Sequence, residues 1–453
     1  MIKALNILFF FLTCFFMHVD TLASDTLKDT YQEPSVSKIS KTFSNLEDIT
    51  PTIGQIDYLN FLRVSIIAQP EYLYAISTVT EKDMSLKFAK RNRFPDLSFN
   101  IINDTSLKRK ITDNTAIRKR RDDSFDAAVS LSQPIYSGGS INSKIAIAKT
   151  EYTLSNLQKE QALSEQILEA NRIYILAVIS DVLYNYGLTL LNETKPYLQK
   201  VKDRVEIGIA DPIELALFSI KLHELESKIQ KLRADRNKNI GSYEYFFKVK
   251  YSKNSLPSIF VPLVEQDRNV SSYDVEASIL NHKSYQQQTK LVKSEFRPQF
   301  GFNTKYTRYD IKDDNKDTDI RGGLYFSMPI FTFGRATAKI SSAQAKAKAA
   351  QMYIDIERKK DDVKENDSIT IIDSSQATRV DVYNSFIDTR AQRRIIKDRL
   401  DIINFAAEAY VDSGLKELMQ LERLLQNELN ILHGYLVYLD HNKSLTSFLR
   451  VKP

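Results

Sequence analysis

Hydrophobic and polar residues alternate one by one in four short stretches of this sequence. The alternating stretches are 96–101, 125–132, 300–306 and 324–328. A period of two with one apolar side is typical of a half-buried strand. In each half of the chain a charged loop separates the two stretches, so the pattern predicts two hairpins, at 94–134 and 297–329.

Two long stretches repeat their apolar residues with the period of a helix. Between Ser140 and Ile207 the only helix breaker is Pro196, and Arg335–Ser413 contains no proline. At 1.5 Å per residue, helices of these lengths span about 100 Å and about 120 Å. Apolar residues recur every three, four or seven positions in three series: Leu176, Leu183, Leu190, Tyr197; Leu215, Phe218, Leu222, Leu225, Ile229, Leu232; and Ile396, Leu400, Ile403, Ala407, Tyr410. This spacing predicts coiled-coil helices that stay in contact over a great length.

The second half of the chain resembles the first. The segment FPDLSFN at 94–100 resembles RPQFGFN at 297–303, and LSQPIYSGG at 131–139 resembles FSMPIFTFG at 326–334. A third match pairs Gly208 with Gly414, each followed by a new helical pattern. Three matches in the same order indicate an internal duplication. We therefore divide the mature chain into a first repeat at 24–272, with a turn at Gly208, and a second repeat at 273–453, with a turn at Gly414.

Residues 1–23 have the features of a secretory signal peptide. Lys3 precedes an apolar run from Ala4 to Met17, and the small residues of Thr21-Leu22-Ala23 suit a cleavage site. The only cysteine, Cys14, lies within this segment, so a lipoprotein signal is the alternative; the residue before it, Thr13, is not the usual small one. No apolar run of about 18 residues follows, so we expect no membrane-spanning helix. An exported chain of this kind is a periplasmic protein, a secreted protein or a β-barrel.

Composition and charge argue against catalysis and nucleic-acid binding. The formal charge of +6 is spread over 453 residues, whereas a nucleic-acid interface needs a concentrated basic face. The histidines at 223, 282, 433 and 441 lack metal-ligand spacing, and no phosphate loop or nucleophile elbow occurs. We therefore expect no enzyme activity, no metal and no cofactor.

Four strands are too few to surround a pore, because about eight are the practical minimum for a barrel. Either the two hairpins lie in a soluble sheet, or several copies of the chain contribute strands to one barrel. The strand pattern by itself leaves both alternatives open.

Taken together, the duplicated motifs make the chain similar to the TolC-like outer-membrane factor family over about residues 58–445. The resemblance implies an α+β membrane protein in which a long α-helical coiled-coil barrel adjoins a shared twelve-stranded transmembrane β-barrel, formed by a homotrimer with four strands per protomer. It places strand–helix junctions at Pro95, Pro134, Pro298 and Pro329, where proline ends strand pairing. It also implies periplasmic helix turns at Gly208 and Gly414, and an equatorial linker at 251–272.

The sequence departs from the family pattern in two places. The interval from Pro329 to Gly414 exceeds that from Pro134 to Gly208 by eleven residues, which would fit either three extra helical turns or a local bulge at 367–375. Family members often carry acidic residues six and nine positions after the second turn glycine, and Gln420 and Arg423 stand there. The candidate polar residues of a gate at the periplasmic mouth are therefore these: Asp211, Glu214, Lys416, Gln420, Glu422 and Arg423. The alternative is that they are ordinary solvated residues of helix ends.

The resulting hypothesis is a passive outer-membrane channel of a tripartite export system, serving type I secretion or efflux. The partners implied are two further copies of the chain, a periplasmic adaptor, an inner-membrane ABC or proton-driven pump, and outer-membrane lipid. The alternatives are a periplasmic adaptor or a structural coiled-coil envelope protein without a pore. Cargo and pump are not encoded in a recognisable motif.

Overall fold

The computed structural model describes residues 58–105, 123–252, 271–311, 317–403 and 407–448. Its elements in chain order are α3 (Tyr58–Ile67), α4 (Pro70–Arg91), β1 (Asp96–Thr105), β2 (Asp123–Tyr136), α5 (Ser140–Glu206), α6 (Pro212–Phe247), α7 (Tyr273–Ser294), β3 (Gln299–Arg308), β4 (Thr318–Ser327), α8 (Arg335–Ile403), α9 (Ala407–His441) and α10 (Leu445–Phe448). The expected signal peptide and most of the linker at 251–272 lie outside the described residues.

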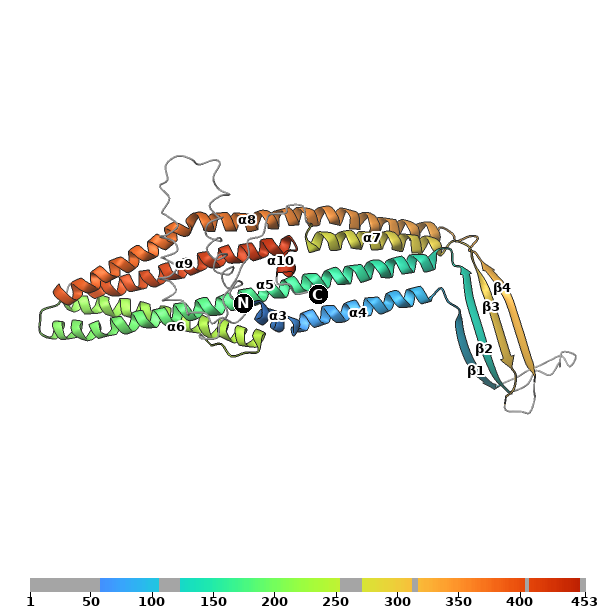
Figure 1. The fold of residues 1–453 in the computed structure, drawn as a ribbon, viewed down its shortest axis with the longest axis horizontal. Helices are drawn as coiled ribbons and strands as arrows, with labels where there is room; N and C mark the ends of the chain where they lie inside the picture. The colour runs from blue at the N-terminus through green and yellow to red at the C-terminus, as the bar shows by residue number, and fades with distance from the viewer. Residues whose placement is uncertain (1–57, 106–122, 253–270, 312–316, 404–406, 449–453) are drawn as a thin grey trace, which may run out of the picture. The chain divides into compact units, whose positions relative to one another are not determined.

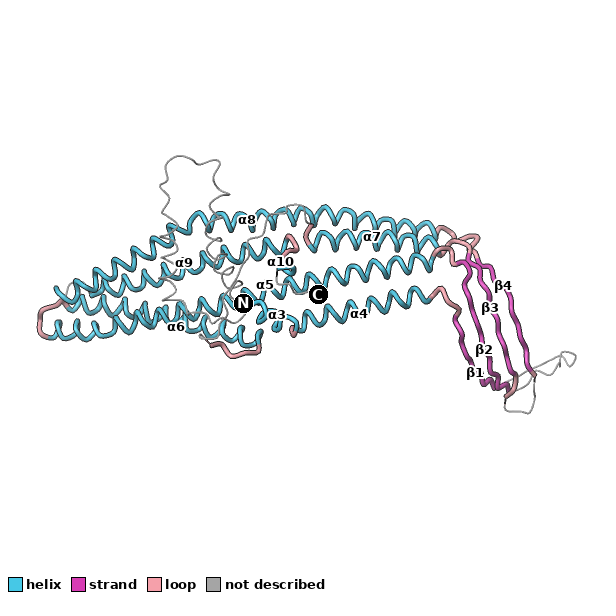
Figure 2. Tube along the Cα trace, viewed as in Figure 1, coloured by secondary structure: helices cyan, strands magenta, loops and turns pink. Residues whose placement is uncertain are grey.

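The four strands form one antiparallel sheet in the order β1-β2-β3-β4. The expected hairpins are therefore present, and β2 and β3 join them into a single sheet (Figure 2). The pairing of β2 with β3 shifts register between Pro134 and Tyr136, where Pro134 lies opposite Gly301 and Tyr136 opposite Phe300. Proline lacks the N–H that a regular ladder needs, so a bulge is where a strand can accommodate it.

The elements of the two halves match in order and in length. Helices α4 and α7 both have 22 residues, β1 and β3 both have 10, and α5 and α8 have 67 and 69. The starts of β2, α5 and α6 lie at 123, 140 and 212, and those of β4, α8 and α9 at 318, 335 and 407. The offset is 195 in all three cases, so the position equivalent to Gly208 is 403.

The expected helix turn at Gly414 is wrong. Gly414 lies inside α9, and α8 ends at Ile403, close to the equivalent of Gly208. From Pro329 to position 403 the interval is 74 residues, equal to that from Pro134 to Gly208, so the eleven-residue excess came from placing the turn at Gly414. The segment 367–375 is helical, and α5 and α8 each span about 100 Å. The error has a physical cause: the apolar spacing through Ile403, Ala407 and Tyr410 continues across the end of α8, and neither glycine nor proline marks the break.

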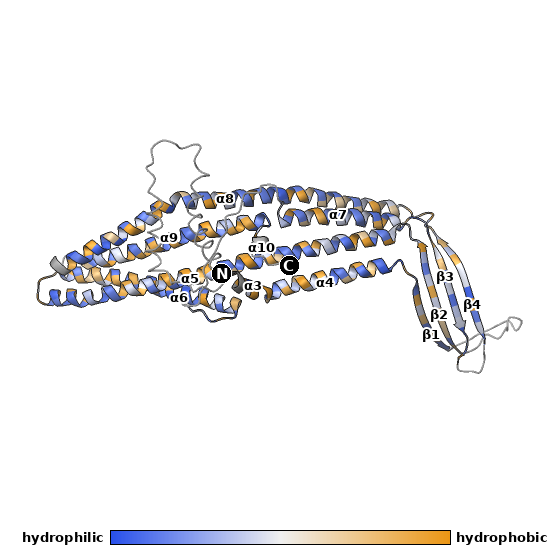
Figure 3. Cartoon of the chain, in the orientation of Figure 1, coloured by the Kyte–Doolittle hydropathy of each residue, from blue (hydrophilic) through white to orange (hydrophobic). Residues whose placement is uncertain are grey.

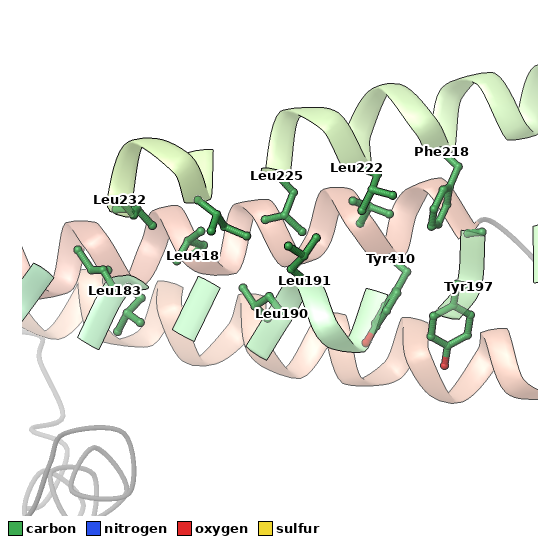
Figure 4. Packing of buried hydrophobic residues seen from close by; sticks show 14 of the residues in the cluster. Leu183, Leu190, Leu191, Tyr197, Phe218, Leu222, Leu225, Leu232, Tyr410 and Leu418 are labelled. Atoms are coloured by element: carbon green, nitrogen blue, oxygen red, sulfur yellow. The ribbon is translucent and has the colours of Figure 1, made fainter. Parts of the chain in front are cut away.

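The chain divides into two compact units, and each repeat contributes to both. The first unit contains α3, α6, α9 and α10, together with the parts of α5 and α8 from Ala162 and Asp362 onward. Its larger apolar core joins α5, α6, α8 and α9. Figure 4 shows residues of this core from α5 (Leu183, Leu190, Leu191, Tyr197), α6 (Phe218, Leu222, Leu225, Leu232) and α9 (Tyr410, Leu418). The predicted seam of α6 is buried here.

The second unit contains the sheet, α4, α7 and the first parts of α5 and α8. Ala148 on α5 packs against Leu86 and Ala89 on α4, so the first part of α5 also meets a neighbouring helix. In the second repeat, Thr289 of α7 donates a hydrogen bond to the carbonyl of Ala343 on α8. The four helices of this unit reach the sheet at one end of its strands (Figure 1).

Helix α5 is long and apolar enough to cross a membrane, although the sequence analysis expected no membrane-spanning helix. One 18-residue window has a mean hydropathy of 1.4, and 56% of that window is buried inside the structure. Its parent helix contributes Tyr174, Ala177 and Leu183 to the apolar cores of the first unit. The apolar character of α5 is that of a core helix.

Truncation of Leu225 tests whether the seam of α6 stabilises the helical unit. Leu225 is fully buried, so Leu225→Ala should lower the free energy of unfolding by about 2–5 kcal/mol. Leu217 lies on the same helix and is 41% exposed, so Leu217→Ala should cost under about 1 kcal/mol. Thermal unfolding followed by circular dichroism compares the two; equal losses would contradict the assigned seam.

Candidate functional site

The sheet has one apolar face and one polar face. Cross-strand partners point to the same side, so the register extends the apolar side chains of each strand across the whole sheet. For example, Phe99 pairs with Val129, and Phe302 with Leu324. The apolar face comprises Leu97, Phe99 and Ile101 on β1, Phe125, Ala127, Val129 and Leu131 on β2, Phe300, Phe302 and Tyr306 on β3, and Ile320, Leu324 and Phe326 on β4. Figure 3 shows the apolar residues along the strands in orange.

Side chains of the apolar face are solvent-exposed in the single chain. Leu97 is 68% exposed, Leu324 80% and Phe326 69%. The opposite face carries Asp96, Ser98, Asn303, Lys305 and Arg321. A sheet that is apolar on one face and polar on the other has the residue pattern of a transmembrane barrel wall, in which the apolar face meets lipid.

The four junction prolines lie where the chain passes between strand and helix, with one difference from expectation. Pro95 and Pro298 directly precede β1 and β3, and Pro329 follows the end of β4 by two residues. Pro134 lies inside β2, which continues to Tyr136 through the bulge. Pro134 therefore does not end strand pairing.

The turn between α5 and α6 is built by Gly208. Its φ of 75° is in the left-handed region that favours glycine, and the N–H groups of Ile209 and Ala210 both donate to the carbonyl of Arg204. Asp211 caps α6 by accepting a hydrogen bond from the N–H of Ile213 at 2.8 Å. Glu214 forms an ion pair with Arg204 across the turn, at 3.4 Å. Both candidate carboxylates thus have local structural partners.

The other candidate gate residues lie along α9. Lys416 pairs with Asp412 at 2.8 Å, and Glu422 pairs with Lys228 of α6 at 2.6 Å. Gln420 and Arg423 line a groove of about 670 Å³ between α8 and α9, and the buried Oε1 of Gln420 accepts no hydrogen bond from the residues that the structure describes. Gln420 and Arg423 were chosen because they lie six and nine positions after Gly414. Since α8 ends at position 403, the residues six and nine positions after it are Ala409 and Asp412, and that reason for choosing Gln420 and Arg423 no longer holds.

A network of charged residues that the sequence analysis missed joins α5, α8 and α9, and its side chains are 12% (Arg393), 1% (Glu417) and 38% (Glu193) exposed. Arg393 of α8 donates to Glu193 of α5 at 2.6 Å and to the hydroxyl of Tyr410 at 2.8 Å. Its guanidinium also lies 4.8 Å from the centre of the Tyr410 ring and 3.5 Å from Glu417 of α9. The Glu417 side chain is 1% exposed and accepts a hydrogen bond from the Tyr186 hydroxyl. Gly414 lies beside Arg393, and a Cβ at position 414 would meet that side chain at an ordinary van der Waals distance, 3.5 Å from its Nε.

The network shifts the pKa values of its members. Burial raises the pKa of the Glu193 carboxyl, but the hydrogen bond and the charge of Arg393 outweigh it, so the net pKa lies below its usual range. Burial raises the pKa of Tyr410 to about 12. The ionised carboxylate and the protonated phenol are therefore the states that the folded network favours.

One sequence signal could have revealed this network. Tyr410, Gly414, Glu417, Leu421 and Leu424 follow one another at steps of four and three along α9, and all are buried. Glu417 is thus a carboxylate at an otherwise apolar seam position. Charged residues at such positions are rarely buried unless they are paired.

Comparisons with known proteins show the fold. The CmeC outer membrane channel of Campylobacter jejuni superimposes with a TM-score of 0.76 at 12% identity, covering 94% of this chain and 91% of that chain. The open state of the MtrE outer membrane channel of Neisseria gonorrhoeae has a TM-score of 0.70 and 11% sequence identity, covering 85% of this chain and 89% of that chain. The outer membrane protein VceC of Vibrio cholerae has a TM-score of 0.67 and 14% sequence identity, covering 83% of this chain and 96% of that chain. No protein-family model and no curated protein matches the sequence. The chain has the fold of these outer-membrane proteins, as the sequence resemblance predicted.

Removing Arg393 tests the network. Arg393→Met leaves Glu417 buried without its closest cation, and breaking one side of a buried ion pair costs about 3–5 kcal/mol. Arg172→Met is the matched control, because Arg172 and Glu169 pair on an exposed face with side chains 49% and 41% exposed. That pair should contribute under about 1 kcal/mol. Urea unfolding of the two variants measures the difference, and a small loss in Arg393→Met would exclude a stabilising role.

Proposed function

We propose that this protein is an outer-membrane channel that conducts cargo passively from the periplasm to the exterior. The observation that carries the proposal is the exposed apolar face of the sheet, backed by a polar face of equal extent. The fold supports it, since the similar structures CmeC and MtrE are outer membrane channels. A periplasmic adaptor or a structural coiled coil would have no use for a sheet with this pattern.

Three copies of the chain would close the barrel. Neighbouring strands of the sheet are antiparallel, so β4 of one copy can pair antiparallel with β1 of the next copy. Three sheets of four strands then form a barrel of twelve strands. Strands of 10 residues are about 33 Å long at about 3.3 Å per residue. A tilt of about 40° reduces this to the roughly 25 Å of an outer-membrane apolar band. Closing the barrel also gives hydrogen-bond partners to the backbone N–H and C=O groups of the edge strands, and lipid cannot provide such partners.

The long helices would form the periplasmic part of the conduit. Transport energy would come from an inner-membrane pump of the ABC or proton-driven type, reached through a periplasmic adaptor. The proposal covers drug efflux and type I secretion alike, because the pump selects the cargo. The chain itself forms the wall of the channel and catalyses no reaction.

The network of charged residues would hold the helical mouth closed. Arg393 ties α8 to α5 through Glu193 and to α9 through Tyr410, so opening these helices requires the ion pair to separate. The groove beside Gln420 and Arg423 and the carboxylates Asp211 and Glu214 remain candidates for contacts at this mouth.

Charges placed on the two faces of β3 test the barrel. Phe302→Arg puts a cation on the face proposed to meet lipid, at a cost of about 2–4 kcal/mol per copy near the middle of the membrane. Asn303→Arg places the same group on the opposite face. We expect Phe302→Arg to abolish heat-modifiable trimers in the outer-membrane fraction. Asn303→Arg should keep the trimers and change the ion selectivity of single channels in planar bilayers. A water-soluble monomer for the unmodified protein, or equal effects of the two variants, would contradict the channel.

Neutralising Glu193 tests the mouth. Because its pKa is lowered in the folded protein, its pairing with Arg393 acts above the ordinary value of 4.5 and is lost as pH falls through the folded pKa. Glu193→Gln should therefore raise single-channel conductance at neutral pH. It should also reduce the further rise that the unmodified channel shows on acidification. The same conductance in both proteins at every pH would show that this network does not hold the mouth.

A further inference from the structure

Four connecting segments leave one end of the sheet together. By register, the start of β1, the end of β2, the start of β3 and the end of β4 lie at the same end. The segments that join them to α4, α5, α7 and α8, taken together with the adjoining helix ends, are 91–95, 137–144, 293–298 and 328–339. All belong to the second unit.

These segments carry many basic residues and few acidic ones. They contain seven lysines and arginines and one acidic residue, Glu295. Glu295 pairs with Lys339 at 2.5 Å. The other six, which form no ion pair within the described residues and which we name the basic collar, are Arg91, Arg93, Lys144, Lys293, Arg297 and Arg335.

An exposed apolar collar lies beside the basic one. Its members are Phe94 (68% exposed), Ile135 (58%), Ile330 (92%), Phe331 (71%) and Phe333 (89%). The rings of Phe331 and Phe333 pack edge to face, with centroids 4.5 Å apart. Ile135 lies in β2 at the bulge between Pro134 and Tyr136, and Ile330 follows the end of β4 by three residues, so both lie at the helix end of the sheet.

Phe333 occupies a backbone conformation that disfavours it. Its φ is 48°, and its equivalent in the first repeat, 195 positions earlier, is Gly138 with φ 64°. A bulky residue in the left-handed region costs about 1–2 kcal/mol relative to glycine. Phe333 recovers little of this by burial in the chain, since its side chain is 89% exposed. A strained and exposed aromatic residue points to an external apolar environment.

We propose that the two collars bind anionic phospholipids at the membrane surface on the helix side of the barrel. The basic collar would contact the headgroup phosphates, and the apolar collar would enter the upper acyl layer. Aromatic residues at this depth are typical of membrane interfaces, and basic residues near an anionic surface gain about 1 kcal/mol each. This inference rests on the proposed function, because it requires the sheet to span a membrane. A soluble acidic partner would match the charges but not the apolar ring.

The test compares lipid association with the assembled trimer. Unmodified protein is reconstituted in phosphatidylcholine vesicles, and the motionally restricted fraction of spin-labelled phosphatidylglycerol is compared with that of spin-labelled phosphatidylcholine by electron paramagnetic resonance. We expect a preference of about threefold or more for the anionic lipid, falling towards one in high salt. No preference, or one that salt leaves unchanged, overturns the proposal without any variant. Inorganic phosphate at equal ionic strength should not displace the lipid; displacement would indicate a free-anion site and also overturn it.

Matched variants locate the effect. Arg91→Gln, Arg93→Gln, Arg297→Gln and Arg335→Gln together should reduce the preference to near one. The control removes the same charge from exposed helical positions of the second unit, by Lys149→Gln, Lys346→Gln, Lys348→Gln and Lys359→Gln, and should keep the preference. Equal loss in both sets overturns the proposal.

The apolar collar is tested separately by Phe333→Gly, which relieves the left-handed strain. We expect it to keep the trimer while reducing the restricted fraction of phosphatidylglycerol. A loss of trimers that does not depend on the lipid would assign Phe333 to a contact between copies instead. Failure of the unmodified protein to form trimers or conduct would refute the proposed function itself, which these lipid readouts do not address.

Discussion

The exposed apolar face of the four-stranded sheet is the constraint on which the rest of this structure depends. Side chains such as Leu324 and Phe326 keep most of their surface exposed in the single chain, and β1 and β4 lie at open edges. Burying such a face is favourable by about 25 cal/mol per Å², so a single chain in water leaves it unsatisfied. A lipid environment with neighbouring copies resolves both problems, since lipid covers the face and strands of other copies pair with the edges.

The helices supply a different kind of stability. Their cores are narrow seams, in which Leu190, Leu225 and Leu418 from three helices meet inside one unit. Seams of this kind can extend indefinitely because each turn repeats the contacts of the last. Specific positions along them are marked by polar groups. The buried Glu417 and Arg393 replace apolar contacts with a directional pair, which fixes which residues of α8 and α9 lie opposite each other.

The duplication explains both the symmetry of the chain and its exceptions. The starts of β2, α5 and α6 recur as those of β4, α8 and α9 at an offset of 195, yet the two copies differ at equivalent positions. Gly138 has become Phe333 at the strand–helix junction, and the glycine turn at Gly208 has no glycine at the equivalent Ile403. The two repeats therefore share one fold and present different side chains at equivalent positions.

The periodicities along the chain determined most of the architecture by themselves. Alternation in steps of two gave the strands and their apolar faces, and steps of three and four gave the helices, because both patterns follow from local backbone geometry. Only the tertiary structure decided where α8 ends, that Gly414 lies inside α9, and that Glu193, Tyr410 and Glu417 converge on one guanidinium. These features depend on which helices lie side by side, and residues 193 and 393 are too far apart in sequence for any local pattern to relate them.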